Sequence, residues 1–249
     1  MRIALTISYL GEKYHGWQIQ NGEQSGNPTI QLALQQAIQK GFGQACQVVG
    51  SGRTDQGVSA LGQVAHMDLE TTVLPETVAY VINQHLPQDI RVITSQLVDN
   101  DFHARYSAKQ KTYCYSVYFS NIAIPYYDQF AVQMNGKIDL EKIREAITYL
   151  VGTHDFTSFC SASTEVVDKV RTITDCQVEK KDGIVSFRIT GNGFLYNMVR
   201  IIVGTLLEVG YGKRLPQDIK TILEAKDRTK AGKTMPAKGL ILYGVDYNK

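Results

Sequence analysis

The residues of this chain with the clearest chemical potential are an arginine and a carboxylate two positions apart, Arg53 and Asp55. They lie in a glycine-rich stretch, 50–60, between two apolar segments that we predict to be strands. Both charged side chains would then sit on a connection emerging from a sheet, and such connections often carry catalytic or binding residues. Asp and Gly are also ordinary turn residues, so a purely structural turn is the competing interpretation.

The glycines of this stretch do not form a nucleotide-triphosphate loop. A Walker loop ends in Gly-Lys-Ser/Thr and leads directly into a helix, and the stretch 50–60 has neither feature. The Gly191-Asn192-Gly193 segment lacks the third glycine of a dinucleotide-binding fingerprint, so we interpret it as a tight turn. The sequence therefore gives little support to nucleotide hydrolysis or dinucleotide binding.

The elements that must position Arg53 and Asp55 are predicted from apolar periodicity, and they occur in the same order twice. The predicted fold class is α+β, with two tandem ferredoxin-like (βαββαβ) units that share a mostly antiparallel sheet with helices on one face and a central cleft. We place the two halves at residues 1–107 and 108–249. The predicted elements are strand 3–10, helix 29–40, strands 47–50 and 63–69, helix 75–86 and strand 91–98, then strand 112–119, helix 140–151, strands 170–179 and 184–190, helix 196–209 and strand 239–247, with a short extra helix at 216–225.

Composition limits the possible functions. The chain has 249 residues, 43% of them hydrophobic, and no apolar run approaches the roughly 20 residues of a membrane span. The N-terminus lacks a signal-peptide pattern, and we expect a cytoplasmic protein. The four cysteines are far apart and the five histidines show no His-x-x-x-His spacing, so we expect reduced cysteines and no structural metal.

The net charge of +2 is small for a nucleic-acid binder, but the charge is unevenly distributed. Two basic clusters stand out, and solvated surface is their ordinary interpretation. Beside the candidate residues Arg53 and Asp55, contacts with phosphates become the stronger interpretation. The clusters are Lys226, Arg228, Lys230, Lys233 and Lys238, opposed by Asp227, and Arg105, Lys109 and Lys111.

The stretch Gly52-Arg53-Thr54-Asp55-Gln56-Gly57-Val58-Ser59-Ala60 resembles the Gly-Arg-Thr-Asp-x-Gly-Val-His-Ala signature of the TruA family of tRNA pseudouridine synthases. Four further segments are similar to motifs of this family and occur in the same order, from the first strand to the C-terminus. They are Tyr9-Leu10-Gly11-Glu12-Lys13-Tyr14-His15-Gly16-Trp17-Gln18, then Asp101-Phe102-His103-Ala104-Arg105-Tyr106 with Lys111-Thr112-Tyr113-Cys114-Tyr115, then Phe194-Leu195-Tyr196-Asn197-Met198-Val199-Arg200, and Pro236-Ala237-Lys238-Gly239-Leu240.

The resemblance implies an enzyme that isomerises uridine to pseudouridine at positions 38, 39 and 40 of the tRNA anticodon stem-loop, with no cofactor and no metal. It also implies a homodimer. Asp55 is implied as the nucleophile and Tyr113 as the active-site tyrosine, although one of Tyr113 and Tyr115 must be mainly structural. We expect Arg53 to pair with Asp55 rather than with an RNA phosphate, and Arg200 to make a second charge contact with Asp55 or the substrate.

Further residues are expected to bind the substrate. The glycines and the threonine lie in the motif of Asp55, the basic residues suit phosphates, and the two aromatic residues near the N-terminus suit stacking on RNA, although a single Trp is more often a packing residue. These candidates are His15, Trp17, Gly52, Thr54, Gly57, Arg105, Arg228, Lys230 and Lys233.

The chain departs from the family signature at Gln56, where a small residue or Lys is usual, and at Ser59, where His is usual. Ser59 cannot carry charge, so we expect altered substrate binding before lost chemistry. A non-catalytic RNA-binding module and a small-molecule enzyme on the same scaffold are the alternatives. The first gives no reason for Asp55, which would repel phosphate, and salt-sensitive tRNA binding would exclude the second.

Overall fold

The computed structural model describes residues 1–20, 28–164 and 166–248, and the chain divides into two compact units. Unit 1 comprises Met1–Lys109 and Ile241–Lys249, and unit 2 comprises Gln110–Leu240. The predicted boundary lies two residues before the observed one. The predicted second half also included 241–249, but these residues belong to unit 1 because their strand pairs with a strand of that unit.

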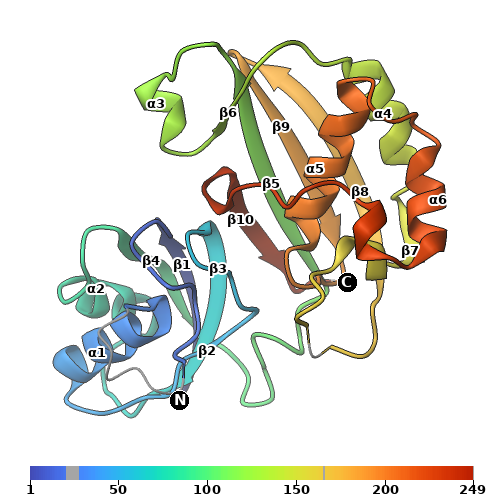
Figure 1. Ribbon diagram of the computed structural model, residues 1–249. Coiled ribbons are helices and arrows are strands. Elements are labelled where there is room, and N and C mark those ends of the chain that lie inside the picture. Colours follow the sequence, from blue (N-terminus) through green and yellow to red (C-terminus); the bar gives the residue numbers. More distant parts are fainter. Residues whose placement is uncertain (21–27, 165, 249) are drawn as a thin grey trace. The chain divides into compact units, whose positions relative to one another are not determined.

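Unit 1 is built on an antiparallel sheet with one added parallel strand (Figure 1). Strand β1 lies between β4 and β3 and is antiparallel to both. The short strand β2 also pairs with β3 and is antiparallel to it. The C-terminal strand β10 pairs in parallel with the start of β3, where Ile241 lies opposite Ser59. The elements are β1 (Arg2–Tyr9), α1 (Ile30–Phe42), β2 (Val49–Gly50), β3 (Ser59–Asp68), the 3₁₀ turn η2 (Pro75–Thr77), α2 (Val78–Asn83), β4 (Ile90–Leu97) and β10 (Leu240–Asp246).

Helix α1 shows how local sequence sets the limits of an element. Its N-cap Thr29 accepts a hydrogen bond from the Leu32 amide, and its C-cap Gly43 has φ of 72°, a left-handed conformation that glycine adopts without strain. The residues predicted for its apolar face are buried: Ile30, Leu34, Ala37 and Ile38. The helix therefore packs its apolar stripe inward, as its periodicity predicts.

The strands of unit 2 lie in the order β5, β9, β8, β7, each antiparallel to its neighbour, with β6 parallel to β5. Helices α4 and α5 contact each other, and α6 lies against β7 and the turn η3 (Figure 1). The elements are β5 (Gln110–Phe119), α3 (Pro125–Asp128), β6 (Val132–Met134), α4 (Leu140–Thr148), β7 (Gly152–Asp155), η3 (Thr157–Phe159), β8 (Val170–Lys181), β9 (Ile184–Gly191), α5 (Met198–Gly210), α6 (Asp218–Ala225), η4 (Arg228–Lys230) and η5 (Ala237–Gly239).

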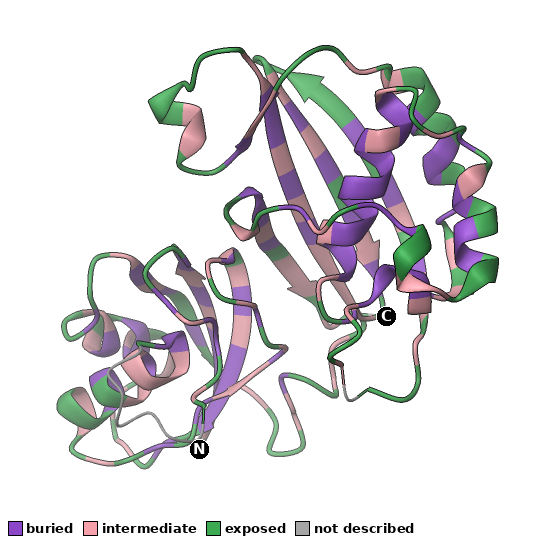
Figure 2. Cartoon of the chain, viewed as in Figure 1, coloured by how far each residue is buried: buried purple, intermediate pink, exposed green. Residues whose placement is uncertain are grey.

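Helix α5 is the core helix of unit 2, because 11 of its 13 residues are buried (Figure 2). A helix that is apolar nearly all round must be enclosed by other elements. Its close neighbours include α4, since a Cβ on Gly210 would meet the side chain of Ile143 at 2.6 Å. This burial fixes the orientation of Arg200, which lies in the first turn of the helix.

The predicted α+β class with a mostly antiparallel sheet and helices is confirmed. The sequence analysis did not predict α3, β6 or β7, which are only three or four residues long. It also extended the helix that begins at residue 140 to residue 151, whereas α4 ends at Thr148. In the described ranges 1–20, 28–164 and 166–248, every helix is too short or too polar to cross a lipid bilayer.

Candidate active site

Asp55 lies in the loop of residues 51–58, here called the Asp55 loop, which joins β2 to β3 in unit 1. The loop alternates between buried and accessible positions. Ser51 and Thr54 are buried, Arg53 is exposed and Asp55 is half-buried. The buried positions anchor the loop in unit 1, while the carboxylate of Asp55 keeps partial access to solvent.

Three hydrogen bonds join the segment that follows β1 to the Asp55 loop and to the residue after it. The Trp17 amide donates to the Thr54 carbonyl at 3.1 Å, and the Gly57 amide donates to the Tyr14 carbonyl at 3.3 Å. The Gly11 amide donates to the hydroxyl oxygen of Ser59 at 3.0 Å, just beyond the loop. Two glycine-rich connections are thus tied together, and Asp55 is bracketed by fixed backbone on both sides.

A buried polar network lies beneath the Asp55 loop. The hydroxyl of Tyr9 is 2.8 Å from Oγ1 of Thr54, and the Gln63 side-chain amide donates to the Gly52 carbonyl at 3.0 Å and accepts from the Ser51 hydroxyl at 2.7 Å. Burial raises the pKa of Tyr9 to about 12, although hydrogen bonds to Thr54 and Gln63 counteract it. Tyr9 is therefore a neutral hydrogen-bonding group at physiological pH.

The sequence analysis named Thr54 but missed Tyr9 and Gln63 as residues that support this loop. Tyr9 is the first residue of the family-like motif 9–18, and this position was the available signal. Gln63 is fully buried within β3, and a buried amide must be hydrogen-bonded. The sequence signal for Gln63 is a polar residue within the strand that directly follows the candidate catalytic loop.

Two predicted RNA contacts in unit 1, Trp17 and His15, occupy different environments. Trp17 is 3% exposed, its ring lies against Gly50, and its centroid is 6.2 Å from that of Tyr9. This burial favours the packing role that the sequence left open. His15 is half-buried, and Arg105 is exposed on the connection between β4 and β5.

In unit 2, Tyr113 and Tyr115 lie two positions apart on β5. Tyr115 is fully buried and its hydroxyl donates to the Pro236 carbonyl at 2.7 Å, and burial raises its pKa. Tyr113 is 9% exposed and contacts Phe194 edge to face, with ring centroids 5.1 Å apart. Tyr115 is the mainly structural member of the pair, which leaves Tyr113 as the candidate for chemistry.

Arg200 is fixed at the start of α5 by the loop that precedes η5. Its Nε donates to the Met235 carbonyl at 2.6 Å and its Nη1 donates to Oδ1 of Asn197 at 2.6 Å. Asn197 is the N-cap of α5 and has φ of 61°, and its side-chain amide also donates to the Ser161 hydroxyl at 2.8 Å. These two hydrogen bonds therefore hold the guanidinium of Arg200 in a fixed orientation.

The members of the basic cluster 226–238 have different roles. Lys226 pairs with Asp155 at 3.0 Å, and Lys238 pairs with Asp128 at 2.6 Å. The guanidinium of Arg228 donates to the Thr234 hydroxyl at 3.1 Å and so stabilises its own loop. The two remaining basic residues of the cluster, Lys230 and Lys233, are exposed.

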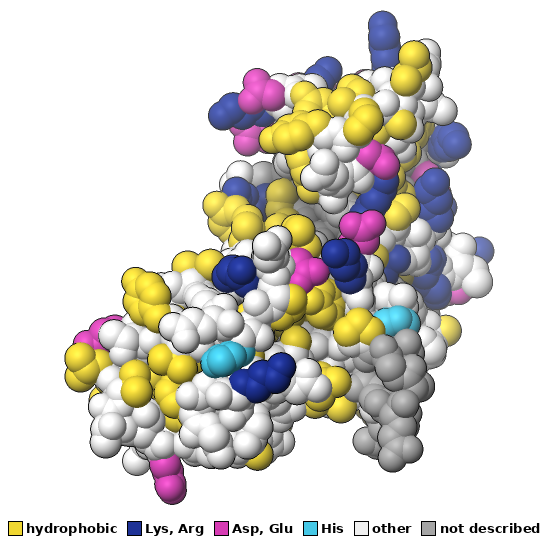
Figure 3. All heavy atoms as spheres, turned by 90° about the vertical axis from the view of Figure 1, so that its left-hand side faces the viewer, with side chains coloured by type: hydrophobic (Ala, Val, Ile, Leu, Met, Phe, Trp, Pro, Cys, Tyr) yellow, Lys and Arg dark blue, Asp and Glu magenta, His cyan; other side chains and the backbone are white. Residues whose placement is uncertain are grey.

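The charge of the chain is unequally divided between the two units. Unit 2 has 18 Lys and Arg residues against 14 Asp and Glu, whereas unit 1 has 8 against 10. In the view of Figure 3, dark-blue Lys and Arg side chains are spread over the surface of unit 2. Unit 2 therefore supplies most of the positive charge that an RNA backbone requires.

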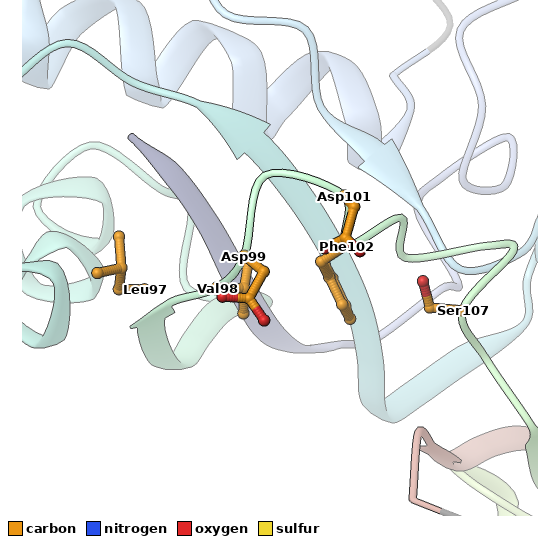
Figure 4. Close-up of a pocket in the computed structure, with 6 residues that line it drawn as sticks. All are labelled: Leu97, Val98, Asp99, Asp101, Phe102 and Ser107. Carbon is orange, nitrogen blue, oxygen red and sulfur yellow. The ribbon is translucent and has the colours of Figure 1, made fainter.

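A cavity of about 460 Å³ in unit 1 does not belong to the predicted site (Figure 4). Asp99 and Asp101 line it, together with Phe102, and two carboxylates disfavour a phosphate ligand. Among the residues that the structure describes, no group of three or more His, Cys, Asp and Glu side chains is arranged to hold a metal ion.

The structure thus assembles the predicted residues in two sets. One set lies in unit 1 and includes the Asp55 loop, and the other lies in unit 2 and consists of one tyrosine and four basic residues. The set in unit 1 is His15, Trp17, Gly52, Arg53, Thr54, Asp55, Gly57 and Arg105, and the set in unit 2 is Tyr113, Arg200, Arg228, Lys230 and Lys233.

The chain is similar to known proteins over both unit 1 and unit 2. The sequence matches the family described as tRNA pseudouridine synthase over residues 5–107 and 146–248, ranges that contain Asp55 and Arg200 but not Tyr113. It is 47% identical over 248 residues to tRNA pseudouridine synthase A of Shouchella clausii, covering 100% of this chain and 94% of that protein. The protein of the same name from Bacillus subtilis is 46% identical over 249 residues, with 100% of both chains covered. That of Acetivibrio thermocellus is 44% identical over 245 residues, covering 98% of this chain and 99% of the relative.

Proposed function

The chain belongs to the tRNA pseudouridine synthase family and isomerises uridine to pseudouridine in tRNA, and we propose that Asp55 is the nucleophile of this reaction. The observation that carries the proposal is the fixation of the Asp55 loop. Three hydrogen bonds between the segment after β1 and residues 54–59, together with the buried network of Tyr9 and Gln63, fix the loop around a half-buried carboxylate. Such preorganisation is what a positioned nucleophile needs.

The reaction detaches uracil from carbon 1′ of its ribose, rotates it and rejoins it through carbon 5. The proton on carbon 5 leaves, and the nitrogen that had carried the sugar gains a proton, so substrate and product are isomers. Nothing is oxidised, and no energy carrier is consumed. An aspartate suits the nucleophilic step because a carboxylate can attack a carbon and leave again, either at the sugar or at uracil carbon 6.

Charge and stacking complete the proposed site. Arg53 keeps Asp55 ionised, since a nearby cation lowers the pKa of a carboxyl group by ~1 to 3 units. Tyr113 stacks on the uracil and assists removal of the carbon 5 proton. Arg200 makes a second charge contact with Asp55 or the substrate, and its fixation by Met235 and Asn197 supports this role.

The proposed architecture behind these roles is a pair of tandem ferredoxin-like units with an RNA-binding cleft. In unit 1 the order of elements is β1, α1, β2, β3, α2, β4, which supports the proposal for the first half. The uridine must leave the RNA stack to reach Asp55, at a cost of a few kcal/mol that is smaller in a weakly paired stem. We place the target uridines at positions 38, 39 and 40 of the anticodon stem-loop.

RNA binding in this proposal depends on exposed cations and on the backbone of the Asp55 loop. Lys230 and Lys233 contact phosphates, as do Arg105 and Arg228, while Gly52, Thr54 and Gly57 allow close approach of the substrate to Asp55. His15 lies beside this loop and contacts the RNA. We further propose that the enzyme acts as a homodimer in the cytoplasm, where its tRNA substrate occurs.

The test is a reaction of the purified protein with unmodified tRNA transcripts, with pseudouridine mapped at single-nucleotide resolution. Wild-type protein should form product at positions 38 to 40, whereas Asp55→Ala should form none and still bind the tRNA. Asp55→Asn is the matched variant, since it keeps the side-chain shape without the charge. Turnover by Asp55→Ala would disprove the nucleophile assignment.

The non-catalytic RNA-binding module makes the opposite prediction. It requires the wild type to bind tRNA without forming product, and it requires Asp55→Asn to leave the cellular function intact. The position of Asp55 argues against it, because a carboxylate in an RNA-binding loop repels phosphate. Light scattering of the free protein and of its tRNA complex tests the proposed homodimer separately.

A further inference from the structure

The loop of residues 101–107 in unit 1 presents an aromatic ring to solvent. Tyr106 is 76% exposed, whereas Ala104, two residues before it, is fully buried. The ring centroids of Tyr106 and His103 are 4.3 Å apart with an interplanar angle of 34°, and the Arg105 guanidinium carbon lies 5.7 Å from the centroid of Tyr106. We call His103, Arg105 and Tyr106 the Tyr106 platform.

The backbone beneath this platform is rigidly anchored. The Ala104 amide donates to Nδ1 of the buried His66 at 3.1 Å, and the Ala104 carbonyl accepts from the Tyr247 hydroxyl at 2.7 Å. The loop also closes on itself, because the Ser107 amide donates to the His103 carbonyl at 2.9 Å and the Ser107 hydroxyl oxygen accepts from the His103 amide at 3.0 Å.

The imidazole of His103 is fixed as well, since its Nδ1 accepts from the amides of Arg105 and Tyr106 at 3.1 and 3.3 Å. The ring that stacks on Tyr106 is therefore held by the same turn that carries Tyr106. An exposed aromatic ring on a preorganised turn loses little conformational freedom when a ligand stacks on it.

We propose that the Tyr106 platform binds an unpaired nucleotide of the tRNA substrate by stacking of its base on Tyr106, with Arg105 beside the neighbouring phosphate. The inference rests on the proposed function, which makes RNA the ligand. A base offers a π-face of matching size, and an arginine next to an aromatic ring suits both the base and the backbone charge. A protein partner would need about 800 Å² of buried surface on each side, far more than one ring provides.

The platform is anchored close to the start of the Asp55 loop. His66, which accepts the Ala104 amide, lies opposite Val49 of β2, and the Asp55 loop begins at Ser51 directly after β2. The platform would therefore hold a nucleotide in addition to the reacting uridine, whose base stacks on Tyr113 in the proposed site.

Tyr106→Ala tests the proposal against two matched variants. Tyr106→Phe keeps the stacking ring, and Tyr80→Ala removes a ring that is 73% exposed on α2 of the same unit. Affinity for an unmodified tRNA transcript is measured at several salt concentrations. Tyr106→Ala should weaken binding about 5- to 150-fold with an unchanged salt slope, while the other two variants stay within about twofold of wild type. Wild-type affinity in Tyr106→Ala, or an equal loss in Tyr106→Phe, would overturn the proposal.

A nucleotide scan makes the test independent of any change in folding. Single abasic sites are placed along the unpaired positions of the transcript, and binding to wild type and Tyr106→Ala is compared. One abasic site should weaken binding to wild type and have no further effect on Tyr106→Ala. Equal effects of every site on both proteins would contradict the proposal. Product formation by wild type is measured in parallel, so that failure of the platform and failure of the proposed function are distinguished.

Discussion

The hydroxyl of Tyr9 lies 2.8 Å from Oγ1 of Thr54, the residue before Asp55, and both side chains are buried. We predict that Tyr9→Phe leaves Thr54 with an unsatisfied buried hydroxyl, which costs roughly 1 to 3 kcal/mol of stability. Because the Asp55 loop loses this anchor, the single-turnover rate should fall by roughly 10- to 100-fold. Rapid-quench kinetics at saturating enzyme and urea denaturation measure the two effects.

Thr54→Val completes a double-mutant cycle for the same hydrogen bond. Valine has the shape of threonine without the hydroxyl, so Tyr9→Phe with Thr54→Val leaves no unpaired group. The two substitutions should be non-additive by about 0.5 to 3 kcal/mol in the free energy of unfolding. Strict additivity would mean that the two hydroxyl groups do not stabilise the loop through each other.

Ser59 supports a second prediction, because its hydroxyl oxygen accepts the Gly11 amide at 3.0 Å. Ser59→Ala should reduce the free energy of unfolding by roughly 0.5 to 1.5 kcal/mol. Asp55 itself is unchanged, so we expect pseudouridine formation to persist with a higher KM. Thermal denaturation and steady-state kinetics check both parts. Loss of turnover at saturating tRNA would instead assign Ser59 to the chemical step.

The sequence predicted most of the long elements and the loop that carries Asp55, because apolar periodicity and turn residues are local signals. It could not show that 241–249 belong to unit 1, since the parallel pairing of Ile241 with Ser59 joins residues far apart in the chain. It also treated the basic cluster as uniform. The partners of Lys226 and Lys238 are Asp155 and Asp128, and tertiary contacts of this kind leave no local pattern.

His66 predicts a dependence of stability on pH. It is buried and accepts the Ala104 amide, and its pKa is lowered by burial, then by His103 and Arg2, while Asp68 acts in the opposite direction. The His66 side chain therefore binds a proton more readily in the unfolded chain than in the folded protein. The stability that comes from burying the neutral imidazole is fully present above pH ~6.5 and is lost as the pH falls below that value.

His66→Gln keeps a side-chain acceptor for the Ala104 amide and does not titrate in this range. The free energy of unfolding from urea denaturation at pH 5 to 8 should therefore be less sensitive to pH in His66→Gln than in wild type. Identical pH profiles in the two proteins would show that His66 does not control this transition.

Lys230 and Lys233 should contribute most of the salt-dependent tRNA binding of their loop, because Lys226 and Lys238 are already paired with carboxylates. We predict that Lys230→Ala with Lys233→Ala weakens binding and lowers the slope of log affinity against log salt by about 1.4 to 1.8, the value for two phosphate contacts. Lys238→Ala is the matched control and should leave that slope nearly unchanged. Equal slopes in all three proteins would remove the loop from the RNA interface.

The loop that carries Lys233 depends on Gly204 of α5. A Cβ at position 204 would overlap the Lys233 carbonyl oxygen, and the adjoining Gly232 amide donates to the Thr205 hydroxyl at 2.9 Å. We predict that Gly204→Ala displaces the loop and weakens tRNA binding. By helix propensity alone, alanine in place of glycine would stabilise α5 by about 1 kcal/mol. A fall in stability would therefore result from the overlap with the Lys233 carbonyl and not from helix propensity. Gly244→Ala is the control, because a Cβ there meets nothing within 4 Å. Stability and affinity at or above wild type in Gly204→Ala would show that the backbone of this loop does not position Lys233.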